Sequence, residues 1–490
     1  MTNPASEILQ RGLRRLGALA AVTVALAGAP PPAMAQPIQS ELRSGPSAKA
    51  LATTVEYVST FYPLWFTYYQ SQVATQNRLV GPARVTSLYH IVVAINVDTL
   101  YASTFLSLAA QPVILTVPAS STVYSVLTLD PYGNVFESGV PSQPPGTSLA
   151  PATYALAGPG YTGPIPAGTT RISMPLDVSI MIFRVDKFSP SGQDQMVQAE
   201  SFRSSIRMQA LCDYSNTPCP NGEPHDTSDG KTLILPEVAF AIPFKTIADT
   251  LATYDPIGFL RQLQAAVNSS NTPAMSTYER NLANDFDRLF GNGHFGFGKL
   301  KLRADLAAGT RLAHELIVER YLRNEGENRW VHFTNIGKWG DHVLDRAAIT
   351  EYIQYGNDIS AAAYYHAFRD EHGIPLHGSP GRRYVLKFAK GQQPEASRFW
   401  SLTAYTPEAI ELVANPANKY VVASYTPGLV TAADGSVTIY MSIDKPPDQP
   451  EANWLPIPPG PFNVMLRVYG PEGSVASDTY VPPAVVQQSP

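Results

Sequence analysis

The chain has 490 residues, of which 44% are hydrophobic and 15% are charged, with a formal net charge of -5 at pH 7. This composition excludes a disordered protein, and the length predicts two or three domains. The slightly acidic balance gives no support for binding to nucleic acid or to an anionic membrane surface. The 44 prolines and 34 glycines favour short strands joined by turns over long helices.

Residues 1–35 have the layout of a secretory signal peptide. Three arginines precede an apolar run that starts at Leu16, and the small residues that end at Ala35 offer a cleavage site before Gln36. The alternative is an uncleaved membrane anchor, but a spanning helix needs about 20 apolar residues and this run has about 14. We therefore expect an exported protein, periplasmic or secreted, with no membrane span after signal cleavage.

The amino-terminal half of the mature chain predicts a β-sandwich domain over 51–240, which follows a polar linker at 36–50. A helix is expected first, because apolar residues recur at helical spacing in the stretch 53–74. Short apolar runs separated by clusters of Gly and Pro then predict strands. These strands are expected at 89–97, 112–118, 122–129, 153–157 and 178–186.

Residues 241–370 predict a mainly helical segment, in which Asp255 and Pro256 mark the start of one helix. Alternating runs return afterwards and predict a carboxy-terminal, jelly-roll-like β-sandwich over 371–475, followed by a tail at 476–490. Its strands are expected at 382–388, 398–405, 419–425, 435–443 and 461–470. The predicted fold class is mainly β with a helical insert.

The only two cysteines, Cys212 and Cys219, lie seven positions apart in a polar, Pro-containing loop. In an exported protein this spacing favours a disulfide bond that staples the loop. A reactive thiol or a metal-binding pair is the weaker alternative, since the spacing is not that of a zinc site and no basic residue adjoins either cysteine.

Several motifs resemble a known pair of domains. The stretches "NVDTLYAS", "TYALAGPGYTGPIPAG" and "NWLPIPPGPFNVMLRVYGP" are similar to domain of unknown function 1254 and domain of unknown function 1214, which occur together in exported proteins. The resemblance covers residues 55–472. It implies an amino-terminal β-sandwich, a helical segment and a jelly-roll-like carboxy-terminal domain, and it implies no established reaction.

The densest histidine cluster lies in the segment 364–379, where the chain departs from the resemblance. His366, Asp370, His372 and His377 offer donor atoms for a metal ion, but their spacing matches no known site. We therefore expect these histidines to lie in a solvated loop, and no metal site is assigned.

The glycine-rich stretch 291–300 lies between helices and is expected to be a loop. Neither a P-loop, a dinucleotide fingerprint nor a GxSxG motif occurs, so the cofactor stays unknown.

Aromatic residues and arginines give the better candidates for a binding site, because they line pockets for sugars and small organic molecules. Large core residues of a sandwich are the competing reading for the same positions. Prolines after Trp454 also predict an ordered loop across the mouth of the second sandwich. The candidate ligand-binding residues are Arg184, Trp339, Tyr364, Trp400, Tyr405, Trp454 and Arg467.

Asp98 and Arg184 are expected to be neighbours. Asp98 interrupts an apolar run, and Arg184 shares a strand face with Ile180 and Ile182, so each side chain points into an apolar region. A guanidinium and a carboxylate can satisfy each other through two parallel hydrogen bonds. The pair could fix the strand register, or line a pocket and hold an anionic or hydroxylated ligand. The remaining alternative is that the two side chains never meet.

Three functional hypotheses stay open. The first is an exported enzyme that acts on a carbohydrate or small organic compound between the helical segment and the second sandwich, with Asp98 or Asp341 transferring a proton. The second is a small-molecule binding protein without catalysis, and the third is an envelope interaction protein. A carboxylate pair facing one pocket would favour the enzyme, whereas aromatics and amides alone would favour binding. The substrate, the reaction and any homo-oligomer are not determined by the sequence.

Overall fold

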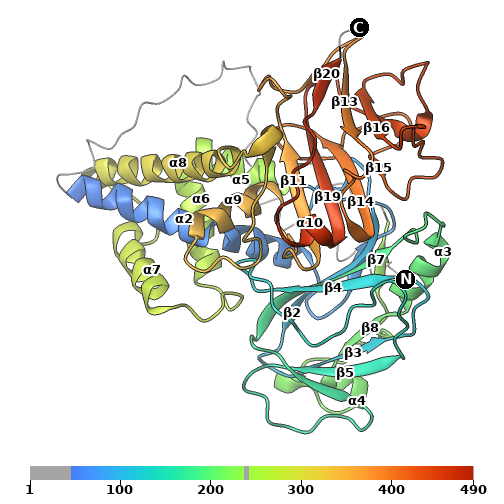
Figure 1. Ribbon diagram of the computed structural model, residues 1–490. Helices are drawn as coiled ribbons and strands as arrows, with labels where there is room; N and C mark the ends of the chain where they lie inside the picture. Colours follow the sequence, from blue (N-terminus) through green and yellow to red (C-terminus); the bar gives the residue numbers. More distant parts are fainter. Residues whose placement is uncertain (1–45, 237–241, 489–490) are drawn as a thin grey trace.

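The computed structural model describes residues 46–236 and 242–488. The predicted signal peptide, 1–35, lies outside these residues. Two groups of strands and one large group of helices make up most of the molecule, with this helical group on the left of Figure 1 and the carboxy-terminal strands above the amino-terminal ones. Among the described residues, three further α-helices lie beside the strands. The predicted fold class, mainly β with a helical insert, is confirmed.

The amino-terminal sandwich consists of two sheets, with strand orders β4-β7-β2-β1-β9 and β6-β5-β3-β8. The inner face of β2 and β7 packs against the second sheet through residues such as Leu106 and Phe183. The opposite face of the same two strands points towards the rest of the molecule. The strands are β1 (Val80–Pro82), β2 (Thr99–Ser107), β3 (Val113–Val117), β4 (Tyr124–Leu129), β5 (Ala152–Ala157), β6 (Thr170–Ser173), β7 (Val178–Asp186), β8 (Arg207–Ala210) and β9 (Leu233–Leu235), and the helices are α3 (Met196–Ser205), α4 (Leu211–Ser215) and the short turn η1 (Pro220–Gly222).

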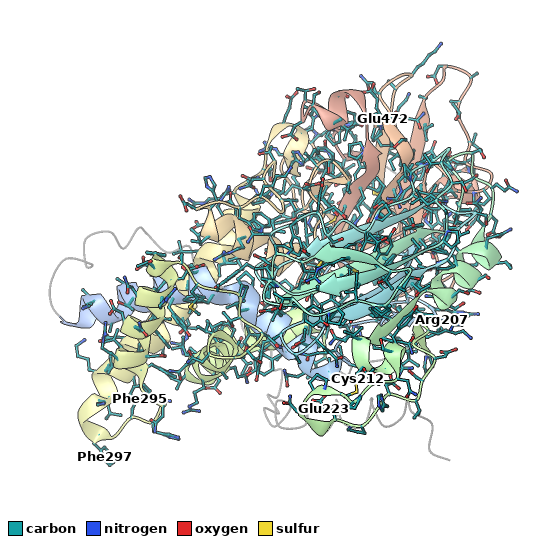
Figure 2. The ribbon with its side chains drawn as sticks, turned by 90° about the horizontal axis from the view of Figure 1, so that it is seen from below. Arg207, Cys212, Glu223, Phe295, Phe297 and Glu472 are labelled. Atoms are coloured by element: carbon teal, nitrogen blue, oxygen red, sulfur yellow. A yellow bond between two sulfur atoms is a disulfide. The ribbon has the colours of Figure 1, made fainter. Side chains whose placement is uncertain are left out.

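The helical segment packs around α2, the long helix at the start of the described chain. Asp255 caps α6 as predicted, because its Oδ1 accepts a hydrogen bond from Gly258 N at 3.0 Å. Figure 2 shows Phe295 and Phe297 at the far end of this segment from Arg207 and Cys212 in the sandwich. Its elements are α2 (Pro46–Val73), α5 (Phe244–Tyr254), α6 (Pro256–Val267), α7 (Thr277–Phe290), η2 (Phe297–Lys299), α8 (Leu300–Leu322), η3 (Glu327–Arg329) and α9 (Val343–Tyr352).

The carboxy-terminal sandwich has two main sheets, with strand orders β10-β11-β19-β14-β15 and β17-β16-β13-β20. Val437, Ile439 and Met441 are buried on one face of β16, as the alternation predicted. The segment predicted as a tail contributes β20, which pairs with β13. The elements are β10 (Trp330–Val331), β11 (Ala362–Ala367), β12 (His377–Gly378), β13 (Arg383–Phe388), β14 (Ala396–Tyr405), β15 (Val421–Ala423), β16 (Val437–Ser442), η4 (Glu451–Asn453), β17 (Trp454–Pro456), β18 (Gly460–Pro461), β19 (Asn463–Pro471), α10 (Gly473–Ala476) and β20 (Val486–Gln488).

One predicted strand is wrong. Residues 89–97 are irregular, and the strand begins only at Thr99. The apolar, β-branched composition of this stretch suits burial, but its backbone groups bond to side chains and to non-strand backbone elsewhere in the fold and not to a neighbouring strand. The loop expected after Trp454 is also shorter than predicted, because Trp454–Pro456 forms β17 at the edge of its sheet, where proline is tolerated.

Candidate functional site

A cavity of about 160 Å³ lies where the amino-terminal sandwich, the helical segment and the carboxy-terminal sandwich meet. Its floor is the outward face of β2 and β7, and its walls come from segment 89–96, the end of α2, the residues after α9, and strands β11 and β19. Among the described residues it is lined by Gln70, Val73, Ala74, Thr75, Val80, Gly81, Pro82, Tyr89, Ile91, Val92, Val93, Ala94, Ile95, Asn96, Tyr101, Ser103, Thr104, Phe105, Ile180, Ile182, Arg184, Leu233, Leu235, Ile353, Tyr355, Tyr364, Arg467 and Tyr469.

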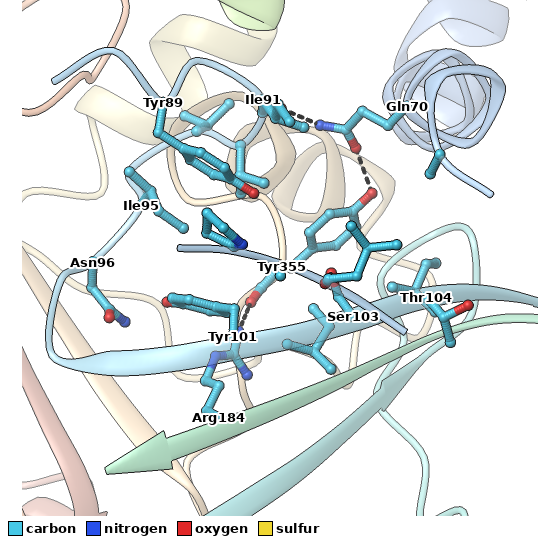
Figure 3. A pocket seen from close by; sticks show the side chains of 18 of the residues that line it. Gln70, Tyr89, Ile91, Ile95, Asn96, Tyr101, Ser103, Thr104, Arg184 and Tyr355 are labelled. Carbon is cyan, nitrogen blue, oxygen red and sulfur yellow. Dashed lines mark hydrogen bonds between the residues drawn. The ribbon is translucent and has the colours of Figure 1, made fainter. Parts of the chain in front are cut away.

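The floor follows directly from strand periodicity. Side chains two apart share one face of a strand, so Ile180, Ile182 and Arg184 of β7 all reach the cavity. In the β2–β7 ladder, Tyr101 is the register partner of Arg184. Figure 3 shows Tyr101 and Arg184 side by side on this floor, with Tyr355 above them.

Segment 89–96 is held from the helical side by two glutamines. Gln70 Nε2 of α2 donates to Ile91 O at 2.6 Å, and Gln354 Oε1 accepts from Val93 N at 3.2 Å. Gln354 Nε2 also donates to Gln70 Oε1 at 2.5 Å, so the two amides support each other. These side-chain bonds satisfy backbone groups that a strand would have paired in a sheet.

The same segment is held from the carboxy-terminal sandwich by strands β19 and β14. Arg467 Nη2 donates to Ala94 O at 2.5 Å, and Tyr405 Oη donates to Ile95 O at 2.7 Å. Ala94 adopts a φ of 50°, a left-handed conformation that is uncommon for alanine. The wall of the cavity is therefore an irregular segment whose shape depends on four separate parts of the chain.

Arg184 is 5% exposed and only partly satisfied. Its Nη1 donates to Asn357 Oδ1 at 3.1 Å and its Nη2 donates to Tyr355 O at 3.0 Å. Its Nε has no hydrogen-bond partner, and its guanidinium carbon lies 5.8 Å from the centre of the Tyr101 ring. Because all of these neighbours are neutral, the charge of Arg184 has no acidic counterpart in contact with it.

Arg467 repeats this pattern on the opposite wall. It is 2% exposed, its guanidinium lies 5.3 Å from the centre of the Tyr405 ring, and its Nη1 has no hydrogen-bond partner. Burial lowers its pKa, but nearby tyrosines and Asp98 outweigh burial and raise the pKa, so it stays charged. Within the described residues, neither cavity arginine forms an ion pair; the ion pair of this region joins Arg398 to Asp186.

The tyrosines of the cavity are neutral donors and acceptors. Burial raises the pKa of Tyr89, Tyr101, Tyr355 and Tyr469 above the ordinary value of 10.0. Tyr355 Oη donates to Gln70 Oε1 at 2.5 Å. At neutral pH these hydroxyls therefore keep their protons and act by orienting neighbours.

The predicted ion pair between Asp98 and Arg184 is wrong. Asp98 is 1% exposed, and its carboxylate accepts hydrogen bonds from Tyr425 Oη at 2.5 Å and Ser401 Oγ at 2.9 Å. The cause is the misplaced strand: Asp98 lies just before β2 and points to the carboxy-terminal sandwich, whereas Arg184 lies opposite Tyr101. Asp98 is not among the residues that line the cavity.

The ion pair that the sequence analysis missed is Arg398–Asp186. Arg398 Nε donates to Asp186 Oδ2 at 3.0 Å, and both side chains are buried. It links β14 to the end of β7, and so joins the two sandwiches beside the cavity. Asp186 is two positions from Arg184 and so shares its face of β7, and this spacing was the sequence signal that could have found the ion pair.

The other candidate ligand residues lie at different distances from the cavity. Arg184, Tyr364 and Arg467 line it, and Tyr405 packs behind Arg467. Three tryptophans are outside the lining and bond elsewhere: Trp339 to Gly133 O at 2.9 Å, Trp400 to Gln393 Oε1 at 3.3 Å and Trp454 to Ser442 O at 3.2 Å. Asp341 is exposed in the turn before α9.

The histidine-rich segment does not converge on one point. His366 is buried, between Tyr321 Oη at 2.8 Å and Asn463 Oδ1 at 2.7 Å, and burial lowers its pKa to about 3. Asp370 accepts backbone hydrogen bonds from its own loop, and His372 and His377 are exposed. The groups of donor atoms that the described residues bring close enough for a metal ion do not include this segment.

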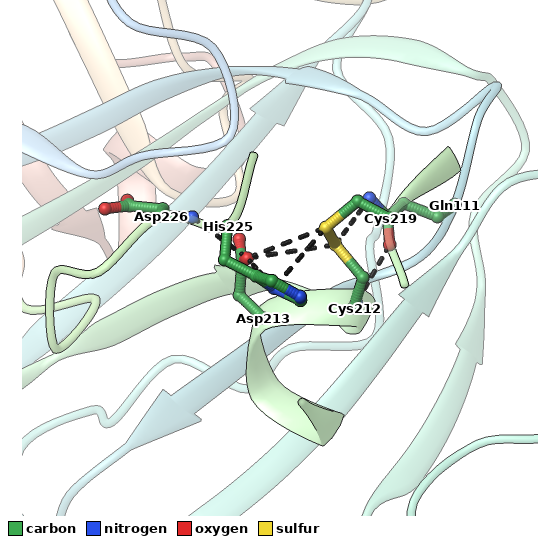
Figure 4. The surroundings of a disulfide bond; sticks show 6 residues. All are labelled: Gln111, Cys212, Asp213, Cys219, His225 and Asp226. Carbon is green, nitrogen blue, oxygen red and sulfur yellow. Dashed lines mark hydrogen bonds and ion pairs between the residues drawn. A yellow bond between two sulfur atoms is a disulfide. The ribbon is translucent and has the colours of Figure 1, made fainter. Parts of the chain in front are cut away.

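The two cysteines form the predicted disulfide bond. Cys212 and Cys219 are joined, with their Cα atoms 5.1 Å apart, and Gln111 Oε1 accepts from Cys212 N at 2.9 Å. Figure 4 shows His225 and Asp213 beside the bond, with His225 Nδ1 3.0 Å from Asp213 Oδ1. The disulfide leaves neither cysteine as a free thiol, and it closes the loop between Cys212 and Cys219 at the edge of the first sandwich.

A second buried charged cluster lies among the helices, and we call it the helical charge network: Tyr62, Lys245, Asp249, His314 and Glu351. Lys245 Nζ donates to Asp249 Oδ2 at 2.8 Å and to Glu351, while Tyr62 Oη donates to Glu351 Oε2 at 2.5 Å. His314 Nε2 lies 3.1 Å from Asp249 Oδ1. Burial raises the pKa of Glu351, but the charges of Lys245 and His314 outweigh it and hold that pKa well below its usual value.

Not one helix within 46–236 and 242–488 combines the length and the apolar character needed to cross a membrane.

Comparisons with known proteins identify two family domains and a shared fold. The profile described as "Protein of unknown function (DUF1254)" matches residues 75–210, and "Protein of unknown function (DUF1214)" matches residues 361–473. No curated protein matches the chain. The crystal structure of the VPA0106 protein from Vibrio parahaemolyticus is similar to this chain, with 18% sequence identity and a TM-score of 0.57. The alignment covers 90% of this chain and 100% of the VPA0106 chain. That likeness concerns the fold alone.

The alignment with a structure of a putative uncharacterized protein from Burkholderia cenocepacia covers 99% of both chains, with 12% identity and a TM-score of 0.43.

Arg184 falls within the first matched domain and Arg467 within the second, so each domain contributes one cationic side chain to the cavity. With both profiles matched in order along one chain, the protein belongs to the family that joins a DUF1254 domain to a DUF1214 domain.

Proposed function

We propose that the protein is an exported binding protein that holds a small, mainly apolar molecule in the cavity. The observation that carries this proposal is the chemistry of the lining. Aliphatic side chains, tyrosines, amides and the two arginines Arg184 and Arg467 surround the space, and the described lining residues include no carboxylate, imidazole or thiol. Apolar cavities of about 150 Å³ bind benzene, so the volume suits a phenyl ring or a short hydrocarbon chain.

The enzyme hypothesis requires a proton-transfer group at the cavity. Neither nominated acid fits this requirement, because Asp98 is engaged by Tyr425 and Ser401 behind the wall and Asp341 is exposed elsewhere. Burial raises the pKa of Tyr89, Tyr101, Tyr355 and Tyr469, so these four tyrosines keep their protons at neutral pH and orient rather than react. A binding protein needs only the contacts that this lining supplies.

Export is supported by the signal-peptide layout of residues 1–35 and by the Cys212–Cys219 disulfide, which forms in oxidising compartments. Intact-mass analysis of the protein recovered from the cell envelope or medium tests this directly. The expected mass lacks the first 35 residues and two hydrogens. Retention of the leader, or a free thiol pair, would contradict export.

Calorimetric titration with benzyl alcohol and 1-hexanol tests the binding proposal. We expect at least one of them to bind with a Kd of about 1 mM or tighter, equivalent to about -4 kcal/mol. Ser103→Phe should abolish binding, because Ser103 projects from β2 into the cavity. The matched control is Thr116→Phe on β3, in the other sheet of the sandwich, which should leave binding intact. Absence of binding for every small probe, neutral or anionic, would contradict the proposal.

A further inference from the structure

The two cavity arginines have hydrogen-bonding capacity that the protein itself does not use. Arg184 Nε and Arg467 Nη1 are both buried and both without a partner, although each guanidinium is otherwise anchored. Leaving a buried charged donor unsatisfied is unfavourable, and native proteins rarely do so without a reason. Both side chains line the same cavity, so a bound molecule can reach both.

The two guanidiniums are linked through a short chain of contacts. Tyr364 is the register partner of Arg467 between β11 and β19. Its hydroxyl accepts from Asn357 Nδ2 at 2.6 Å, and Asn357 Oδ1 in turn accepts from Arg184. The charges of both arginines also lower the pKa of Tyr469, which burial raises. The cationic groups are therefore neighbours across one end of the cavity.

We propose that the ligand is a small monocarboxylic acid, bound as its carboxylate between the guanidinium groups of Arg184 and Arg467. This inference rests on the proposed function and specifies the chemical class of its ligand. A carboxylate has two oxygens in one plane, so it can accept a hydrogen bond from each of the two guanidinium groups. A phosphate offers three oxygens and would leave one without a cationic partner.

The apolar part of the acid occupies the remainder of the cavity. Ile180 and Ile182 continue the β7 face beyond Arg184, and Phe105 lies on the adjacent strand. The lining is thus charged at one end and aliphatic or aromatic beyond it. A phenyl ring or a chain of about six carbons fits a volume of this size, as judged from the benzene-binding cavities.

A pair of probes of equal shape tests the charge requirement. Phenylacetate and phenylacetamide differ in charge and little in size, and hexanoate and hexanamide form a second pair. Calorimetric titration of the purified chain should show each carboxylate binding about tenfold more tightly than its amide, or better, because charge-assisted hydrogen bonds are the stronger kind. Equal affinities, or tighter binding of the amides, would overturn the carboxylate proposal.

Variants separate the two arginines from general damage to the fold. Arg184→Gln and Arg467→Gln should each reduce the preference for carboxylate about tenfold, while amide binding persists. Arg467→Lys keeps the charge and should retain part of the preference. Arg288→Gln, an exposed position on α7, is the matched control and should change nothing. A preference that survives both glutamine variants would overturn the assignment.

The titrations also separate this inference from the proposed function. If benzyl alcohol or hexanol binds and the carboxylates show no advantage, the binding function stands and the carboxylate assignment falls. If neither neutral nor charged probes bind, both the proposed binding function and the carboxylate assignment are wrong. Circular dichroism melts of each variant establish that a lost preference is measured on folded protein.

Discussion

The helical charge network and the cavity both bury cations, but they differ in how those cations are neutralised. Lys245 contacts two carboxylates, and the Tyr62 hydroxyl and His314 complete the set. Arg184 and Arg467 are equally buried, yet they contact backbone carbonyls, an amide and aromatic rings. Charges that are paired internally serve the fold, whereas charges that keep free donors beside a cavity are available to a ligand.

The largest effect is expected from breaking the helical charge network. Lys245→Met leaves Glu351, which is 0% exposed, with His314 at 3.8 Å as its only nearby cation among the described residues, and should lower the free energy of unfolding by about 3–5 kcal/mol. The double variant Lys245→Met with Glu351→Leu should recover most of this loss, since Asp249 and His314 still neutralise each other. Urea denaturation followed by circular dichroism measures both.

Lys231→Met provides the control, because Lys231 and its partner Asp229 are both about half exposed. It should leave the unfolding curve almost unchanged. If Lys245→Met were as stable as this control, the helical charge network would contribute little to the free energy of unfolding. The proposed difference between its paired charges and the cavity arginines would then be wrong.

An intermediate effect is expected from pH. Burial lowers the pKa of His314, but hydrogen bonds and the charges of Glu351 and Asp249 outweigh it and raise the pKa to about 9, from an ordinary value of 6.5. Protonated His314 therefore stabilises the fold fully below about pH 6.5, and this contribution is lost as the pH rises through 9. The expected loss is on the order of 1–3 kcal/mol.

Urea midpoints measured from pH 6 to 10 should fall across this window for the natural chain, and His314→Gln should remove most of the fall. His342→Gln is the control, because His342 is exposed in the turn before α9. If the two variants showed the same pH dependence, His314 would not be the titrating group.

The smallest effect on stability is expected at the cavity. Arg467→Met removes a buried cation whose desolvation is unfavourable, and Ala94 O keeps a second donor, Tyr405 Oη at 3.4 Å. The free energy of unfolding should therefore fall by only about 1 kcal/mol. Urea denaturation beside Lys245→Met compares the two regions directly. Losses of equal size would mean that Arg467 is a structural charge like Lys245.

The elements with a clear local pattern were predictable from the sequence. Helix α6 has both its capping residue, Asp255, and its apolar spacing in sequence, and β7 shows the alternation that placed Arg184 on the face of Ile180 and Ile182. These signals depend on residues a few positions apart. They were therefore sufficient for the fold class and for one wall of the candidate site.

The remainder of the site depends on contacts that are distant in sequence. Residues 89–97 have strand-like composition, but Gln354 and Arg467 hold them in an irregular path, and nothing near position 94 indicates this. Misplacing the strand then misdirected Asp98. The helical charge network was missed as well, although Lys245 and Asp249 at a spacing of four on one helix gave a partial signal.

The irregular wall has a consequence for how the chain matures. Residues 89–96 are synthesised early, whereas the groups that hold them, Gln354, Tyr405 and Arg467, are synthesised hundreds of residues later. The first sandwich can begin to fold as a unit once its own strands are complete. The cavity wall must wait for the last long strand, β19, so the cavity is completed only after most of the carboxy-terminal sandwich has been synthesised.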